Sequence, residues 1–383
     1  MKLSGKTELV DYIRNLIKER GAISFRDFME IALYHPEYGY YTSYKEKIGG
    51  FGDYFTASEL DPIFGQLLSK QFVEIYENYF KNQFINIVEI GSGKGYLLHD
   101  IIRYIKNFYP DIYKNIKFIS VEKSGYHRQL QKDLLKDFDN IDYIPDISDL
   151  PKIKGIIYSN ELFDAIPVHM IKVKEGKIYE VYISLDEEDE VVEIERETCD
   201  EIKKYIKDLD IDLPDNITTE INIDAVKVIS MLAEKLERGF IFTIDYGYPS
   251  KELYKPYRNR GTLICYYKHT YNENYYQNVG LQDITSHVNF SALSYYGEKA
   301  GLKTLGFTDQ AHFLINLGLA QELNSLYEKG DYKSYERANR LKTLILPKGM
   351  GEKFKILIQS KNIDNPKLEG LKIVPPQTDR YKL

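Results

Sequence analysis

The ten residues VEIGSGKGYL, positions 88–97, end an apolar run in three closely spaced glycines and lead directly into a helical pattern. Because glycine carries no side chain, such a turn lets main-chain N–H groups and a helix N-terminus approach a ligand closely. The dinucleotide-binding fingerprint has the spacing G-x-G-x-x-G, whereas the third glycine here comes one residue earlier. The stretch by itself is compatible with a nucleotide-like ligand site and with a plain strand-to-helix corner.

Buried-strand patterns alternate with helical patterns on both sides of this turn. An alternation of this kind predicts a parallel sheet within an α/β domain. The C-terminal part returns to the same pattern, with a helix followed by two strands. The strands are predicted at 84–90, 116–122, 155–161, 239–247, 302–308 and 353–361, and the helices at 62–79, 97–105, 127–138, 225–237 and 291–301.

Two segments depart from this alternation. Residues 35–59 are rich in glycine and tyrosine and show no clear period, which is typical of a functional loop or lid. Residues 170–222 contain a hairpin pattern that turns at Glu175–Gly176, followed by an acidic run at 186–190. We interpret this second segment as an insertion that projects from the sheet.

The composition disfavours several classes of protein. A formal net charge of −7 argues against nucleic acid as the main partner, because phosphate binding needs a clustered basic surface; it suits a basic protein or peptide. Two cysteines, Cys199 and Cys265, and the lack of an H-E-x-x-H motif predict no disulfide framework and no metal site. No apolar run approaches the ~20 residues of a membrane span, and the N-terminus shows no signal or presequence pattern. We therefore expect a cytoplasmic protein without membrane association.

An acidic residue supports a ligand at the glycine turn. The next predicted strand ends at Glu122, where a carboxylate can accept hydrogen bonds from both hydroxyls of a ribose. The tight glycine spacing, with Glu89 before the first glycine, resembles motif I of class I S-adenosylmethionine methyltransferases, in which the loop encloses the amino-acid part of the cofactor. The resemblance assigns the cofactor-binding role to Glu122 and to four residues of the turn, Gly91, Ser92, Gly93 and Gly95.

A second polar group follows the strand at 155–161. The stretch SNELFDAIPVH, positions 159–169, places Asn160, Glu161 and Asp164 at the carboxyl edge of the sheet, where open α/β sheets bind ligands. Paired carboxylates can grip a guanidinium through two hydrogen bonds and orient its nitrogen for methyl transfer. We assign Glu161 and Asp164 to catalysis and Asn160 to the cofactor. The alternative for both acids is capping of a helix N-terminus.

Several motifs occur in an order that resembles one family over nearly the whole chain, the MidA-type methyltransferases. This resemblance implies a class I methyltransferase fold, with a Rossmann-like mixed seven-stranded sheet, an N-terminal helical and loop region over the cofactor, and an inserted substrate-facing region. It also implies S-adenosylmethionine as cofactor, S-adenosylhomocysteine as product, and protein arginine methylation, known in the family for a respiratory complex I subunit. The motifs are HPEYGYY, GDYFTASELDPIFGQLL, VEIGSGKGYL, NELFDAIPVH, TIDYGYP, RGTLICYYKH, DITSHVNFSAL and LPKGMGEKFKILI.

One departure from the family pattern lies in the N-terminal loop. The family often has T-S-P-E where this chain reads T-A-S-E, positions 56–59, so the proline before the glutamate is replaced by Ser58. We assign Thr56 and Glu59 to the mouth of the substrate site, and the serine loosens the turn that would hold them.

Other candidates come from the ends of strands. His287, in DITSHVNFSAL, can assist deprotonation near neutral pH, or can serve only as a cap or loop hydrogen-bonding group. Asp245 and Tyr246 end the predicted strand at 239–247 and are assigned to the substrate, with packing as the alternative for the tyrosine. Asp146 and Ile147 follow a short strand and, by analogy of topology with methyltransferases, lie beside the adenine.

We therefore expect an S-adenosylmethionine-dependent methyltransferase that modifies an arginine in a basic segment of a protein. A small-molecule acceptor is the first alternative, and a non-catalytic assembly chaperone is the second, although the intact glycine turn and Glu122 argue against it. An NAD-dependent dehydrogenase is disfavoured by the early third glycine. The predicted regions are an N-terminal helical and cofactor-covering loop region at 1–80, a methyltransferase domain at 81–169 and 223–383, and an inserted hairpin and acidic subdomain at 170–222.

Overall fold

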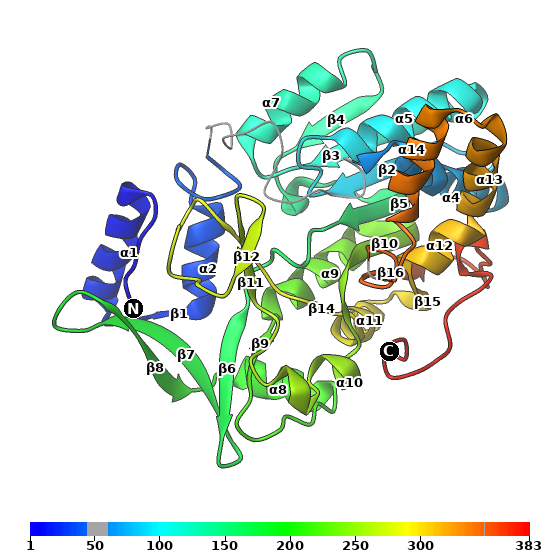
Figure 1. The fold of residues 1–383 in the computed structure, drawn as a ribbon. Helices are drawn as coiled ribbons and strands as arrows, with labels where there is room; N and C mark the ends of the chain where they lie inside the picture. The colour runs from blue at the N-terminus through cyan, green and yellow to red at the C-terminus, as the bar shows by residue number, and fades with distance from the viewer. Residues whose placement is uncertain (44–59, 348) are drawn as a thin grey trace. The chain divides into compact units, whose positions relative to one another are not determined.

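The computed structural model describes residues 1–43, 60–347 and 349–383. The chain divides into two compact units, each assembled from segments that are distant in the sequence (Figure 1). The first unit comprises Met1–Tyr54, Phe163–Val228 and Tyr248–Leu293, and the second comprises Phe55–Leu162, Ile229–Gly247 and Ser294–Leu383.

The second unit is built on a mixed sheet in which seven strands follow the order β15-β16-β10-β5-β2-β3-β4. Neighbours from β10 to β4 pair in parallel, and β16 pairs antiparallel with both β10 and β15. The α/β class and the mixed sheet expected from the sequence are confirmed. The strands are β2 (Ile85–Ile90), β3 (Ile116–Val121), β4 (Ile141–Ile144), β5 (Ile153–Asn160), β10 (Leu236–Tyr248), β15 (Lys303–Asp309) and β16 (Phe354–Lys361).

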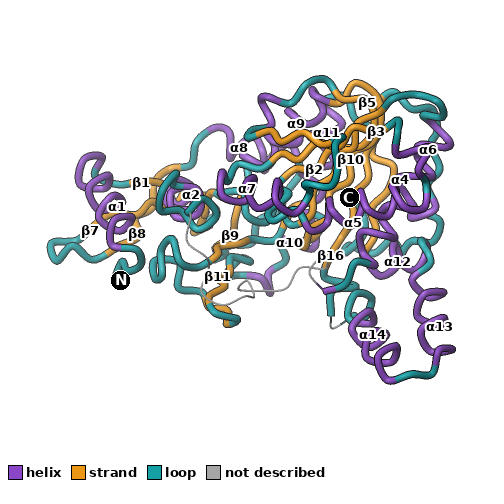
Figure 2. The backbone as a smooth tube through the Cα atoms, turned by 90° about the horizontal axis from the view of Figure 1, so that it is seen from above, coloured by secondary structure: helices purple, strands orange, loops and turns teal. Residues whose placement is uncertain are grey.

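Helices cover both faces of this sheet, which is why its central strands are almost continuously apolar. On one face, the ring of Phe72 in α4 packs 5.3 Å from Tyr158 and 5.5 Å from Phe242; Figure 2 shows α4 and α12 together on one side of the strands. On the other face, Gln359 of β16 donates to the carbonyl of Ser294 in α11. The helices are α4 (Ile63–Tyr79), α5 (Tyr96–Phe108), α6 (Pro110–Tyr113), α7 (Gly125–Leu134), α9 (Ile223–Lys235), α11 (Phe290–Lys299) and α12 (Gln310–Asn316).

A helical hairpin near the C-terminus, α13 (Leu319–Lys329) and α14 (Tyr332–Lys342), has no counterpart among the sequence predictions. Arg337 of α14 forms two hydrogen bonds of 2.9 Å with the carboxylate of Asp61, just before α4. Because Asp61 is buried and the pairing is bidentate, this contact ties the hairpin firmly to the start of α4.

The first unit combines helices with a sheet in the order β1-β7-β6-β9, to which β8 is added along β7. The hairpin expected at Glu175–Gly176 is present, since Lys174 of β6 pairs with Lys177 of β7. A second, small sheet has the order β12-β11-β13. The elements are α1 (Thr7–Arg20), β1 (Ile23–Ser24), α2 (Phe25–Tyr34), β6 (His169–Lys174), β7 (Lys177–Leu185), β8 (Val191–Glu197), α8 (Asp200–Asp208), β9 (Thr218–Ile221), α10 (Ser250–Leu253), β11 (Ile264–Tyr267), β12 (Thr270–Asn272), β13 (Asp283–Thr285) and β14 (Val288–Asn289).

The boundaries of this unit differ from the three regions proposed from the sequence. Its core contains Ile13 of α1, Phe28 of α2, Val181 of β7 and Ile284 of β13, all of them buried. The segment 170–222 therefore shares one apolar core with the N-terminal helices and with residues beyond β10. Only the tertiary structure brings these segments together.

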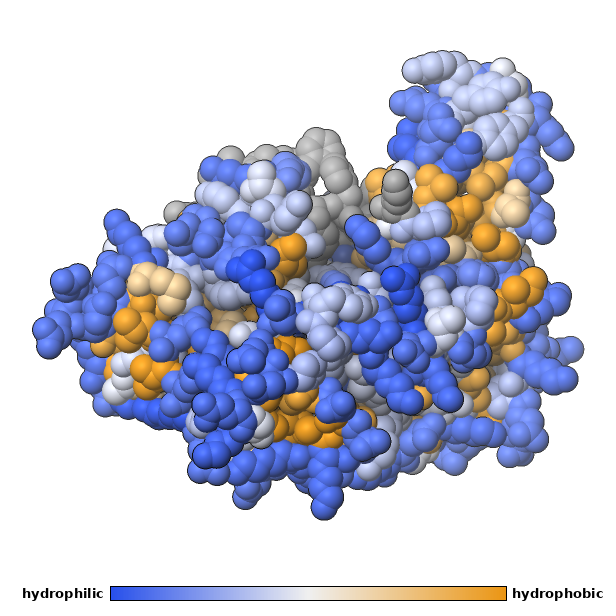
Figure 3. All heavy atoms as spheres, turned by 60° about the horizontal axis from the view of Figure 1, so that its bottom comes forward, coloured by the Kyte–Doolittle hydropathy of each residue, from blue (hydrophilic) through white to orange (hydrophobic). Residues whose placement is uncertain are grey.

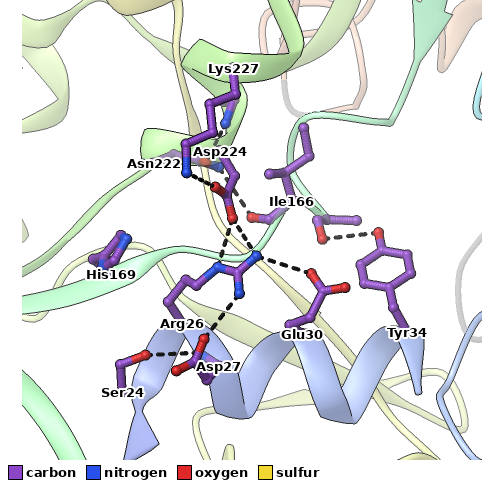
Figure 4. A network of polar contacts seen from close by, with 12 residues as sticks. Ser24, Arg26, Asp27, Glu30, Tyr34, Ile166, His169, Asn222, Asp224 and Lys227 are labelled. Carbon is purple, nitrogen blue, oxygen red and sulfur yellow. Dashed lines mark hydrogen bonds and ion pairs between the residues drawn. The ribbon is translucent and has the colours of Figure 1, made fainter. Parts of the chain in front are cut away.

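An ion-pair network fastens α2 to the beginning of α9. The guanidinium of Arg26 contacts Asp224 at 2.6 Å, Asp27 at 3.0 Å and Glu30 at 3.4 Å (Figure 4). Ser24 caps α2 by accepting a hydrogen bond from the main-chain N–H of Asp27. The carboxylates keep the guanidinium charged and raise the pKa of Arg26, although its partial burial acts in the opposite direction.

Hydrophilic side chains cover most of the face shown in Figure 3, and apolar groups lie between them in small areas. Among the described residues, no helix combines the length and apolarity needed to cross a membrane.

We expect Gly239→Ala to destabilise the second unit severely. A β-carbon at this position would lie 1.8 Å from the carbonyl oxygen of Gly155 on β5, and the φ of +142° is unfavourable for other residues. Overpacking against a rigid backbone costs about 1–3 kcal/mol or more. Gly176→Ala is the control, because it has a positive φ but open space around it. The unfolding temperature should fall strongly in Gly239→Ala and only slightly in Gly176→Ala. Equal decreases in the two variants would contradict the close contact between Gly239 and Gly155.

Candidate active site

The glycine turn occupies the carboxyl end of β2, as the sequence predicts, and all three glycines have positive φ, from +51° to +85°. A β-carbon on Gly91 would come within 2.8 Å of Leu162, and one on Gly95 within 2.9 Å of Gln131. Gly93 is different, because no described atom would lie within 4 Å of its β-carbon. Gly91 and Gly95 are therefore needed because neighbouring side chains pack closely against them, whereas Gly93 borders open space.

Glu122 directly follows β3 and holds the turn in place. Its Oε2 accepts a hydrogen bond of 2.8 Å from the N–H of Gly93, and its Oε1 accepts one of 2.8 Å from the N–H of Ser124. Each carboxylate oxygen can accept a second hydrogen bond. The geometry is therefore compatible with Glu122 binding ribose hydroxyls while it also fixes the loop.

A buried amide that the sequence analysis missed supports the same turn from α7. The side chain of Gln131 donates to the carbonyl oxygen of Gly93 at 2.7 Å and accepts a bond of 2.6 Å from the hydroxyl of Ser120. That hydroxyl also lies 3.0 Å from the hydroxyl of Ser92. The available signal was Gln131 itself, a polar residue four positions before the buried Leu135 and so on the inward side of its helix.

Two buried acceptor atoms beside the turn fit the amino-acid part of S-adenosylmethionine. Glu89 pairs with Tyr158 on β5, so Asn160, two residues further, projects from the same face of the sheet. Within the described residues, Glu89 Oε2 and Asn160 Oδ1 are buried and have no hydrogen-bond partner. Buried acceptors are normally paired, and an ammonium group supplies the missing donors. The residues present therefore fit this cofactor.

Burial changes the acidity of Glu89. Desolvation raises its pKa from the usual range to about 8, and hydrogen bonding by Ser92 opposes this shift. The Tyr158 hydroxyl lies near enough to interact with the carboxylate, although it makes no hydrogen bond of good geometry. In the ligand-free protein, Glu89 thus stays protonated near neutral pH.

Glu161 stands just after β5 in a left-handed conformation, with a φ of +53°. Such a conformation costs an L-residue roughly 1–2 kcal/mol and is concentrated at functional sites. Its N–H donates to the carbonyl of Ile244 at 2.9 Å, and the side-chain amide of Asn160 donates to its Oε1 at 3.1 Å. The side chain is half-buried, and β5 is the direct neighbour of β2, the strand that leads into the glycine turn.

Asp164 belongs to the first unit, and its side chain is buried. Three successive main-chain carbonyls of its loop accept hydrogen bonds from donors that lie far apart in the sequence. The carbonyl of Asp164 accepts from the N–H of Ser286 at 3.0 Å. That of Ala165 accepts from the hydroxyl of Tyr34 at 3.1 Å, and that of Ile166 from the side chain of Asn222 at 3.1 Å; Figure 4 shows Tyr34, Ile166 and Asn222.

The remaining candidates have clear places in the structure. Asp245 is fully buried on β10 and accepts hydrogen bonds from the N–H groups of Leu162 and Tyr246. The ring of Tyr246 packs 5.6 Å from Phe354. His287, in the first unit, donates through its main-chain N–H to the hydroxyl of Thr262 at 2.9 Å, and its ring lies 5.5 Å from Tyr248.

Asp146 is exposed after β4 and accepts two hydrogen bonds from Ser148, which lower the pKa of its carboxyl. Ile147 follows it in a short 3-10 turn. Thr56 and Glu59 lie outside the residues that the structure describes. In the described ranges, no group of three or more histidine, cysteine or acidic side chains is arranged to hold a metal ion.

Comparison with known proteins decides the family. The sequence model described as "Putative S-adenosyl-L-methionine-dependent methyltransferase" matches residues 67–308, more than half of the chain. The chain belongs to this methyltransferase family. The resemblance to MidA-type methyltransferases is confirmed, and with it the class I fold and the dependence of this methyltransferase on S-adenosylmethionine.

Solved structures and curated relatives cover nearly the whole methyltransferase. A Burkholderia thailandensis protein bound to S-adenosyl-homocysteine has a TM-score of 0.85 and 29% identity, over 97% of this chain and 96% of its own. Protein arginine methyltransferase NDUFAF7, mitochondrial, from Danio rerio is 26% identical over 90% of this chain and 85% of its own length. The protein of the same name from Homo sapiens is 24% identical, with 91% and 82% coverage.

These names overturn one expectation. The sequence analysis predicted a cytoplasmic protein because it found no presequence pattern, but the curated relatives from zebrafish, human, fly and cattle are named mitochondrial. The prediction of a cytoplasmic location is therefore wrong by this comparison. The error came from treating the lack of a recognisable presequence as evidence for a compartment.

We expect Gly93→Ala to fold but to bind S-adenosylhomocysteine about tenfold to a hundredfold more weakly, because the methyl group would occupy the open space beside the turn. Gly330→Ala is the matched control, with a φ of +69° and equally open surroundings on the far end of α13. Both glycines have a φ in the left-handed region, so comparing the two variants by titration calorimetry separates the effect on the site from the effect of backbone strain. Unchanged affinity in Gly93→Ala would exclude Gly93 from cofactor contact.

The pKa of Glu89 predicts a pH-dependent stability difference. The folded protein keeps a proton on Glu89 up to about pH 8, whereas the unfolded chain loses it near pH 4.5, so this residue destabilises the fold as pH rises through that window. Glu89→Gln cannot ionise. The unfolding free energy of Glu89→Gln relative to wild type should therefore rise between pH 4.5 and pH 8, by up to roughly 5 kcal/mol. Above pH 8 this difference should stay constant. Thermal unfolding of both proteins across this pH range measures it. A gap independent of pH would contradict the raised pKa.

Proposed function

We propose that this methyltransferase transfers a methyl group to an arginine guanidinium in a basic segment of a protein. The observation that carries the proposal is Glu161, a half-buried carboxylate in a left-handed conformation at the end of β5. It stands beside Asn160, which we assign to the cofactor, and one strand from the glycine turn. A carboxylate at this position can bind the guanidinium that is to be methylated.

The chemistry favours a guanidinium over other acceptors. Arginine stays protonated at all physiological pH values, and its planar N–H groups match a carboxylate through two parallel hydrogen bonds. Glu161 then binds two N–H groups, orients the remaining nitrogen, and draws the positive charge away from it. A neutral acceptor would have no need of a carboxylate held at this cost in backbone strain.

Two further observations support a basic protein substrate. The curated relatives are named protein arginine methyltransferases. In addition, residues 170–222 contain 17 acidic and 7 basic residues, so this segment carries more excess negative charge than the whole chain. An excess of negative charge of this kind attracts basic segments over several ångströms.

In the proposed mechanism, S-adenosylmethionine supplies, when bound, an electrophilic methyl group on a sulfonium. Glu122 and the glycine turn hold the cofactor, and Glu89 with Asn160 accepts hydrogen bonds from its ammonium group. Glu161 would hold the guanidinium so that one nitrogen faces the methyl carbon in line; the assignment of Asp164 to the same group stays a prediction from the sequence. Transfer would form a new N–C bond as the S–C bond breaks, and the nitrogen would then release a proton to solvent; the role of His287 as a proton acceptor stays a prediction from the sequence.

We expect Glu161→Gly and Glu161→Gln to fold and to lose about 100-fold or more of transfer, because each removes one partner of a charge-assisted pair. Glycine adopts a positive φ without strain, so Glu161→Gly should unfold at or above the temperature of wild type. The assay uses labelled S-adenosylmethionine and a peptide library with one fixed arginine. The same library with lysine at that position is the control.

The expected product is methylarginine, found after acid hydrolysis of the arginine library alone. Label in the lysine library, or full activity of either Glu161 variant, would reject the proposal. A strongly destabilised Glu161→Gly would show that this residue serves the fold and not the reaction.

A further inference from the structure

A buried carboxylate supports the backbone at Glu161 from the neighbouring strand. Asp245 on β10 is completely inaccessible to solvent. Its Oδ2 accepts a hydrogen bond of 3.2 Å from the N–H of Leu162, and its Oδ1 accepts one of 2.9 Å from the N–H of Tyr246. The side chain therefore binds the residue that directly follows Glu161.

This contact continues the ladder between β5 and β10 where its main-chain pairing stops. The parallel register pairs Asn160 with Ile244, and the N–H of Glu161 still donates to the carbonyl of Ile244. At Glu161 the chain turns into its left-handed conformation and leaves the ladder. The next N–H, that of Leu162, consequently has a carboxylate oxygen as its acceptor in place of a strand carbonyl.

A buried lysine occupies the position opposite Asp245 in the sheet. Lys355 lies directly opposite Asp245 in the antiparallel pair of β10 and β16 and is equally buried. Asp309 lies opposite Lys355 on its other side, in β15. Opposite charges at facing positions of neighbouring strands are favourable in a sheet, and Asp245 accepts its main-chain hydrogen bonds in this setting.

We propose that Asp245 is a positioning residue that holds Glu161 in its left-handed conformation and so aims its carboxylate at the guanidinium. This inference rests on the proposed function of Glu161. It differs from direct contact between Asp245 and the substrate, because the Asp245 side chain is completely inaccessible to solvent.

The test uses two small probes and no protein substrate. One is an adenosine conjugate that carries a guanidino group on a short 5′ chain, and the other is its primary amine counterpart. The ratio of their dissociation constants measures how much more tightly the enzyme binds a guanidinium than a primary ammonium group. S-adenosylhomocysteine, titrated in parallel, reports the cofactor site alone.

In wild type, the guanidino conjugate should bind about tenfold more tightly than the amine. Asp245→Asn replaces one acceptor oxygen with an NH2 group, so one main-chain N–H loses its partner. This variant should lose the preference while its affinity for S-adenosylhomocysteine stays within about threefold of wild type. In a Glu161→Gln background, which already lacks the preference, Asp245→Asn should change the ratio no further.

Asp309→Asn is the matched control. Asp309 is also buried near the carboxyl edge of this sheet and accepts a main-chain N–H, that of His312, at 2.8 Å. This variant should keep the preference of wild type. If Asp245→Asn does not fold, adding Glu161→Gly should restore folding, because glycine needs no support at a positive φ; failure of that rescue would overturn the proposal.

The outcomes separate the two proposals. A preference that survives in Asp245→Asn would overturn the positioning role and leave the guanidinium site of Glu161 intact. A wild type that does not distinguish the conjugates would reject the proposed function itself. Loss of S-adenosylhomocysteine binding in Asp245→Asn, with Asp309→Asn unaffected, would show that Asp245 serves the cofactor site and would also overturn the positioning role.

Discussion

Where parallel strands end, their main-chain N–H groups lose the ladder partners that satisfy them elsewhere, and this constraint shapes the site of the methyltransferase. Buried N–H groups must find other acceptors. At the ends of β2 and β3, the N–H groups of Gly93 and Ser124 find the two oxygens of Glu122. At the end of β5, the N–H of Leu162 finds Asp245. Each acid thereby fixes a turn that we assign to ligand binding.

The carboxyl edge of this sheet contains several residues whose burial or backbone conformation is energetically unfavourable. Glu89 is buried and protonated near neutral pH because desolvation raises its pKa, Glu161 has a positive φ, and Asn160 Oδ1 has no hydrogen-bond partner within the described residues. Unfavourable features of this kind persist where function requires them and the surroundings enforce them. They lie within a few residues of one another on β2 and β5, the two adjacent central strands. The rigid, buried sheet beneath them is what makes such a concentration of unfavourable groups tolerable.

Sequence reasoning succeeded where a single segment carries the signal. The apolar run before Gly91, the acid that ends β3, and the hairpin turn at Glu175–Gly176 are local patterns, and the structure has each of them in the expected place. It missed Gln131, Tyr34 and Asn222, which act through contacts with residues 38, 131 and 56 positions away. A polar side chain within an amphipathic helix does not show which distant carbonyl it will meet. The helical hairpin α13–α14 was also missed, although Arg337 ties it to Asp61 across 276 residues.

The sequence by itself determined the α/β class, the glycine turn, the acid after the next strand and the methyltransferase family, because strand periodicity, glycine spacing and ordered motifs are properties of neighbouring residues. Only the tertiary structure decided that the segment 170–222 shares a core with the N-terminal helices, that Glu161 is held in a left-handed conformation, and that Asp245 binds the main chain beside it. The physical reason is that burial, backbone strain and side-chain to main-chain hydrogen bonds depend on which strands become neighbours. That choice is made by the packing of the whole chain.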